Sequence, residues 1–269
     1  MGHELLVLTR SWFLNNATKE SRANITKLIN KAYSLVHFKY ECISSCRVTN
    51  ADTLISDLEM DKCDEFCYYV VLGPTEKFDS WKNEGFSRQF VPTTSLANAY
   101  DCNIPQKYAE ELQFDASSDI AVVVPPGDFQ FDGHTLSRVI SACGLKGYKG
   151  TNNGTGVKPL TLAAVTSFMR QSAAPTLELV ISRCLLDPKI LAYLTHDTLE
   201  TIDTLRIHAD VIKEHQLVDF YTKKCHFKQD DKHDISVSTV DECPFEDMMA
   251  IKKPFTISFL YRDVSTSHY

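Results

Sequence analysis

Short apolar runs that stop at glycine or proline alternate along this chain with segments of helical spacing. Phe66–Leu72 is dense in aromatic and β-branched residues and ends at Gly73-Pro74, and Ile120–Val124 ends at Pro125-Pro126. Runs of this length that end at turn residues predict strands. Between Ile25 and Val36 the apolar residues instead recur three and four positions apart, which predicts a helix. Strands alternating with helices limit the chain to an α/β fold.

The whole chain follows the order β-α-α-β-β-β-α-β-α-β-β around one mixed central sheet. The helices are expected from Ser21, from a cap at Asn50 or Asp52, from Pro175, and over His215–Lys224. The strands are expected at Glu4–Trp12, Phe66–Leu72, Ile120–Val124, Leu160–Phe168, Thr204–Ile212, Ile235–Val240 and Phe255–Tyr261. We therefore expect a single domain over residues 1–269.

Two insertions are expected in this domain, near residues 75–118 and 125–157. The first is polar, with a short helix predicted near Gln106–Leu112. In the second, Leu136–Cys143 suits a short helix, and several glycines lie between positions 133 and 156. Such a glycine density predicts a mobile loop.

Charge and cysteine content narrow the function classes. The net charge is −7, which argues against binding to nucleic acid or to a membrane surface, because both favour a basic face. No apolar run approaches the ~18–20 residues of a membrane span, and the first residues lack the pattern of a signal peptide. Nine cysteines, an odd number, favour reduced thiols. The expected compartment is the cytoplasm, with the nucleus as the alternative.

The C-terminal third carries a motif. The strand Thr204–Ile212 is followed by a helical segment in which Phe220, Tyr221, Lys223 and Phe227 keep a distinctive spacing. This unit resembles the strand and helix of the GCN5-related N-acetyltransferase superfamily (GNAT), except that His226 stands where that family usually has glycine. The resemblance implies the GNAT fold for most of the chain and identifies no subfamily.

The resemblance also implies a loop that binds the pyrophosphate of acetyl-CoA, because backbone N–H groups at a helix N-terminus can bind phosphate. The expected loop is Arg170, Gln171, Ser172, Ala173 and Ala174, after a strand in which Val165 and Thr166 orient the cofactor. Ala173 replaces a family glycine, and Pro175 removes one N–H donor. An alternative loop at Gln130–Thr135 matches the loop sequence of the family better. However, Gln130 lies 91 residues before Tyr221 and Arg170 lies 51 before it, and the family usually has a shorter separation.

The implied function is an acetyl-CoA-dependent N-acetyltransferase, an acyltransferase acting on an unidentified amine of a small molecule or peptide. Tyr221 would protonate the leaving thiolate, since a phenol and a thiol have comparable pKa values. His208 and Glu214 are candidate general bases for the amine. Lys146, Lys149 and Lys158 are candidate contacts for the adenosine 3′-phosphate or for an acidic partner, or else ordinary solvated residues.

Two alternatives remain open. The first is a degenerate acetyltransferase fold that binds a ligand or protein without catalysis, which the missing glycines favour. The second is a zinc-stapled interaction module based on Cys42, Cys46, Cys63 and Cys67, with His37 nearby. Their spacing of three intervening residues is less typical of zinc than two. No metal is therefore expected.

Overall fold

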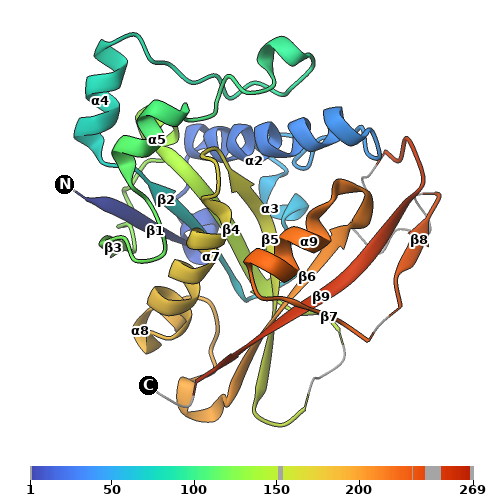
Figure 1. Ribbon diagram of the computed structural model, residues 1–269. Helices are drawn as coiled ribbons and strands as arrows, with labels where there is room; N and C mark the ends of the chain where they lie inside the picture. Colours follow the sequence, from blue (N-terminus) through green and yellow to red (C-terminus); the bar gives the residue numbers. More distant parts are fainter. Residues whose placement is uncertain (1, 151–153, 232, 240–249, 267–269) are drawn as a thin grey trace.

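The computed structural model describes residues 2–150, 154–231, 233–239 and 250–266. Its strands form one mixed sheet in the order β3-β1-β2-β4-β5-β6-β9-β7, with β8 also pairing β9 (Figure 1). The strands are β1 (His3–Thr9), β2 (Phe66–Leu72), β3 (Ile120–Val123), β4 (Val139–Gly147), β5 (Val157–Ser167), β6 (Thr204–Ile212), β7 (Lys228–Gln229), β8 (Ile235–Val237) and β9 (Phe255–Ser265). Most neighbours are antiparallel, whereas β1–β3 and β5–β6 are parallel. This arrangement confirms the general α/β class.

Helices cover both faces of the sheet. Successive side chains of β1 point to opposite faces and therefore enter two different hydrophobic cores. Leu6 and Leu8 join a core with the first group of helices, and Leu5 and Val7 join another with the second group. The first group is α1 (Arg10–Asn15), α2 (Lys19–Tyr40), α3 (Leu54–Asp57) and α6 (Gly133–Ser137). The second group is α4 (Thr75–Asn83), α5 (Gln106–Leu112), α7 (Ala173–Val180), the π-helical turn η2 (Ile181–Leu185), α8 (Pro188–Leu191) and α9 (Leu217–Lys224). The described residues also form three 3₁₀ turns: η1 (Leu96–Asn98), η3 (Leu199–Thr201) and η4 (Lys213–His215).

The long helix α2 follows directly from its sequence. Its cap is Thr18, whose hydroxyl accepts a hydrogen bond from the Ser21 N–H at 3.2 Å, so the helix begins before Ser21, where the sequence predicted its start. It ends at Tyr40, and the capping residue that follows, Glu41, adopts a left-handed conformation with φ 57°. None of the helices in the described ranges combines the length and apolar character that a membrane span needs.

The helix predicted over Leu136–Cys143 is wrong. The short helix α6 is capped by Asp132, which accepts a hydrogen bond from the Thr135 N–H at 2.8 Å, and it ends at Ser137. The central strand β4 then begins at Val139 and pairs with both β2 and β5. A side chain at Gly144 would contact the carbonyl oxygen of Ala163 at 3.2 Å, so this glycine permits close packing of strands and is not part of a loop.

Other differences lie at element ends. The helix expected near Asn50 is the single turn α3, and the segment 75–118 contains α4, η1 and α5. The strand expected over Ile235–Val240 is β8, which ends at Val237, and Val240 itself lies outside the described residues. Residues 151–153 of the glycine-rich segment also lie outside them.

Candidate binding gap between β5 and β6

Strands β5 and β6 pair along only part of their length. The parallel register joins Val157–Thr161 to Thr204–His208, whereas β5 continues to Ser167. Within the described residues, the edge of β5 that faces β6 therefore has no strand partner beyond Thr161. Backbone N–H and C=O groups are obligatory hydrogen-bonding groups, so an open strand edge is a natural place for a ligand with amides of its own.

A bulge accompanies this separation. On its other edge β5 pairs with β4, and the register shifts between Ala142 and Gly144. Opposite this shift, Ala164 has φ 47°, an unusual conformation for a residue with a side chain. The buried Tyr68 hydroxyl donates a hydrogen bond to the Ala164 carbonyl oxygen at 3.4 Å and supports the bulge. Bulges re-aim side chains and end strand pairing, as happens here.

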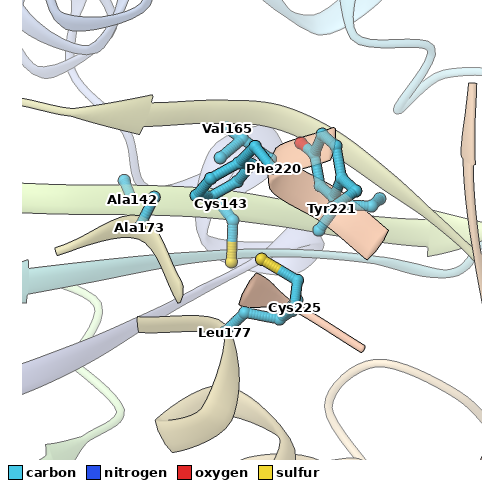
Figure 2. A pocket seen from close by; sticks show the side chains of 9 residues that line it. Ala142, Cys143, Val165, Ala173, Leu177, Phe220, Tyr221 and Cys225 are labelled. Carbon is cyan, nitrogen blue, oxygen red and sulfur yellow. The ribbon is translucent and has the colours of Figure 1, made fainter. Parts of the chain in front are cut away.

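A small apolar cavity lies at this gap (Figure 2). The volume open to the centre of a water molecule is about 10 Å³, so the cavity has room for about one water. Its walls come from β4, β5, α7 and α9, and the lining residues are Ala142, Cys143, Leu162, Val165, Ala173, Leu177, Phe220, Tyr221 and Cys225. A larger ligand can enter only if side chains at its walls move.

The two cysteines of the cavity are unreactive. Figure 2 shows the sulfur atoms of Cys143 and Cys225 turned toward each other. Burial raises the pKa of each thiol to about 12, so neither is a thiolate at neutral pH. Since the thiolate is the nucleophile, these cysteines contribute apolar surface.

Tyr221 lines the cavity as a buried, neutral phenol. Its ring packs edge-on against Phe220 at 5.2 Å and Phe227 at 5.3 Å between centroids. Burial raises the pKa of Tyr221 well above its ordinary value. Lys223 makes an exposed ion pair with Asp219 at 2.8 Å, one helical turn away. The residues that suggested the acetyltransferase motif therefore have packing and helix-surface roles.

The two candidate bases do not line the cavity with Tyr221. His208 is buried at the last position of β6 that pairs with β5, and its ring stacks on Tyr148 at 3.9 Å between centroids. Its Nδ1 atom lies 4.0 Å from a carboxylate oxygen of Asp230. Glu214 accepts a hydrogen bond from the Thr256 N–H at 2.8 Å. Both side chains thus have structural partners of their own.

The loop from β5 to α7 is organised by hydroxyl groups. The Ser172 hydroxyl lies 2.9 Å from that of Ser167 and donates to the Met169 carbonyl oxygen at 2.9 Å. Gln171 adopts a left-handed conformation with φ 64°. Of the other expected loop residues, Val165 and Ala173 line the cavity, Thr166 is buried, Ala174 is half-buried, and Arg170 and Gln171 are exposed.

The alternative loop lies elsewhere. Gln130 accepts a hydrogen bond from the Thr18 hydroxyl at 2.6 Å, and the Phe131 carbonyl accepts one from Asn24 at 3.0 Å. These contacts fix Gln130–Thr135 against the start of α2. The structure therefore separates this segment from the cavity.

Ion pairs account for the three lysines considered for a phosphate. Lys146 and Lys149 both bind Glu59, at 2.5 and 2.6 Å. Lys158 binds Glu65 and also Asp197, the latter at 2.5 Å.

The cysteines considered for zinc do not form a metal site in the part of the chain that the structure describes. No group of three or more His, Cys, Asp or Glu side chains there has the placement to hold a metal ion. Burial raises the pKa of Cys67 to about 12, which is the behaviour of a small apolar side chain.

Several residues of the gap escaped sequence reasoning. Ala142 and Cys143 fall within the helix that the sequence predicts over Leu136–Cys143, and Leu177 shows only a helical spacing. Arg262 of β9 binds Glu178 of α7 through two bonds of 2.5 and 2.9 Å, and it donates to the Cys225 carbonyl oxygen at 3.0 Å. It thereby joins α7 to the end of α9, on both sides of the cavity. No local signal in the sequence marks this contact, because the three residues lie far apart in the chain.

Comparison with known proteins identifies a different family from the one expected. A family model described as Sporulation protein RMD6 matches residues 1–264. The chain is also similar to Sporulation protein RMD6 of Saccharomyces cerevisiae, with 23% identity over 254 residues that cover 93% of this chain and 91% of that protein. The resemblance to GNAT acetyltransferases is therefore wrong as a family assignment. The acetyltransferase activity inferred from it is withdrawn, and so is the assignment of the chain to a degenerate branch of the acetyltransferase family.

Proposed function

The chain belongs to the sporulation protein RMD6 family, and we propose that it acts in sporulation by binding a small molecule in the gap between β5 and β6. The observation that carries the proposal is the open edge of β5 beyond Thr161, beside an apolar cavity. Binding alone is proposed. Acetyl transfer and an acceptor amine form no part of it.

Acetyl-CoA is the ligand that we propose. Its pantetheine arm is narrow and contains amide groups, which can pair with the free edge of a strand. Its thioester end is apolar and suits walls such as Val165 and Leu177. Its phosphates would lie near the exposed Arg170 and the N-terminus of α7, where the helix dipole favours negative charge.

The order of elements around the gap supports this proposal. Strand β5 leads into α7, and β6 leads through η4 into α9, so that both helices begin beside the diverging ends of the strands. We propose that this part of the predicted order, β-α-β-α-β, defines the binding unit. The setting is proposed to be the cytoplasm or nucleus, where the cysteines of the described residues, all free thiols, stay reduced.

A thermal shift with acetyl-CoA tests the proposal. A ligand at 100 times its dissociation constant adds about 2.7 kcal/mol of stability. For a chain of this size, that raises Tm by roughly 5–10 °C. Coenzyme A without the acetyl group is the comparison ligand, because it keeps the arm and phosphates. An unmoved Tm at millimolar acetyl-CoA would overturn the proposal.

A matched pair of variants localises the site. Val165→Phe fills the cavity, and Val122→Phe enlarges another half-buried valine that packs on the same core from β3. We expect Val165→Phe to abolish the shift and Val122→Phe to keep it. Circular dichroism checks that both variants are folded. An equal shift in both folded variants would place the ligand elsewhere.

A further inference from the structure

We propose that a face made by α2 and residues 85–100 docks a segment of a protein partner that carries acidic and apolar side chains. We call it the α2–excursion face, and its members are Lys27, Phe38, Lys39, Val91, Leu96 and Tyr100. Figure 1 shows residues 85–100 running beside α2, outside the sheet. This face is separate from the gap between β5 and β6.

Exposed apolar side chains gather in these two segments. Val91 is 52% exposed, Leu96 80% and Tyr100 61%, and Phe38 of α2 is 37% exposed. They are four of the six large apolar side chains that are exposed among the described residues. Single exposed apolar residues are ordinary, but their concentration in one region marks an interaction surface.

The exposed segment is held firmly in place. The Lys31 ammonium, from a side chain only 1% exposed, contacts the Asn98 carbonyl oxygen at 2.6 Å and Asp101 at 2.7 Å. The Thr93 N–H donates to the Ser34 hydroxyl at 2.7 Å. A surface ordered before binding loses less entropy when a partner docks.

A second cation, on the half-buried Arg88, fixes the base of the same segment. The Arg88 guanidinium donates to the carbonyl oxygens of Cys102, Ser137 and Val139, at 2.5, 2.8 and 2.7 Å. It also lies over the Phe90 ring, at 4.8 Å from the centroid. These contacts hold a segment that has little regular secondary structure in one defined shape.

The charge of the α2–excursion face indicates which kind of partner it can bind. The whole chain has 35 acidic residues in 269, yet residues 21–40 and 85–100 contain none. Lys27 and Lys39 are exposed, and no carboxylate of the described residues forms an ion pair with either of them. Two exposed lysines beside exposed apolar side chains are complementary to an acidic segment with apolar residues.

A protein segment fits this face better than a membrane. Electrostatic binding to anionic lipid typically uses clusters of four to eight lysines or arginines, at about 1 kcal/mol each. The α2–excursion face has two exposed lysines. Its specificity would therefore come from Leu96 and Tyr100 inserting into a complementary partner.

The test uses a phage-displayed library of random short peptides, selected on the folded full chain. We expect enrichment of peptides that combine Asp or Glu with Leu, Phe or other apolar residues. The double variant Leu96→Ser with Tyr100→Ser should bind the selected peptides at least about tenfold more weakly. Lys27→Glu with Lys39→Glu should lose the acidic peptides as well.

Matched controls come from the opposite side of the sheet. Tyr193→Ser removes another exposed aromatic ring, and Lys189→Glu reverses another exposed lysine, and both should bind the peptides as wild type does. Enrichment without acidic residues, or binding that Leu96→Ser with Tyr100→Ser leaves unchanged, would overturn the proposal. Two further results would also overturn it. One is Leu96-dependent binding to phosphatidylserine vesicles, and the other is self-association that the double variant abolishes.

Discussion

Two imidazoles, His37 and His215, meet where α2 packs against η4. Burial is the main reason that the pKa of each is lowered to about 4, and His37 further lowers that of His215. The His215 ring also stacks on Tyr40, at 5.2 Å between centroids. Both side chains are therefore neutral at physiological pH and take up protons much less readily in the folded than in the unfolded chain.

The lowered pKa values predict acid sensitivity. The unfolded chain binds protons at these histidines near pH 6.5, so their contribution to stability is complete above that pH and is lost as the pH falls toward 4. His215→Gln removes one such group. We expect the free energy of unfolding, measured in urea, to fall less between pH 6.5 and 4.5 in this variant than in wild type. His196→Gln, at an exposed histidine, is the control, and an equal decline in wild type and His215→Gln would contradict the assignment.

Lys31 supports the segment beside α2 from a fully buried position. Lys31→Met keeps the apolar stem but leaves Asp101 and the Asn98 carbonyl oxygen without their cation. We expect a loss of about 2–4 kcal/mol in the free energy of unfolding. Lys27→Met, at an exposed position of the same helix, should change it by less than about 0.5 kcal/mol. A small effect at Lys31 in urea denaturation would show that the segment is held by other contacts.

The surroundings of individual side chains are the feature that the sequence predicts least well. Phe220, Tyr221 and Phe227 keep the spacing of a family motif, and in the structure their rings pack against one another at the end of one helix. The same spacing is compatible with a family motif and with the packing of a helix end, so the amino-acid sequence alone cannot distinguish the two. Lys31 gave no signal, because a lysine within a helix is ordinarily on its surface.

At the scale of elements, the strength of the local pattern decided what could be predicted. The strands Phe66–Leu72 and Thr204–Ile212 and the helix Gln106–Leu112 have the predicted bounds. Strand β4 was missed because its glycines signal a loop locally, whereas their reason is contact with β5 and Glu65. The divergence of β5 from β6 had no local signature either, since it depends on pairing between distant segments.

The ion pair between Arg262 and Glu178 links the elements that flank the gap. Arg262→Lys keeps the charge but loses the forked geometry and the bond to the Cys225 carbonyl oxygen. We expect acetyl-CoA to bind about tenfold more weakly, a change of about 1.4 kcal/mol, in isothermal calorimetry. Arg206→Lys is the control, because Arg206 makes a similar forked pair with Asp263 away from the cavity. Equal affinities in the two variants would contradict a positioning role for Arg262.

At the scale of the whole molecule, an α/β architecture was predictable and the family was not. Alternating strand and helix patterns are enough to indicate a mixed sheet covered by helices. Function resides in a few side chains placed on such a sheet, and many families can share the same general class. The family was identified by the match of a family model over residues 1–264, whereas the local motif pointed to a different family.

The central claim is that acetyl-CoA binds along the open edge of β5, and hydrogen–deuterium exchange of the full chain tests it most directly. We expect acetyl-CoA to slow amide exchange in peptides covering residues 162–174, where the strand edge and the loop to α7 lie. A smaller slowing is expected in Leu217–Cys225, because α9 closes the other side of the cavity. Peptides from residues 85–100 should exchange as in the free protein. Unchanged exchange over 162–174 at saturating acetyl-CoA, or protection confined to other parts of the chain, would contradict the account.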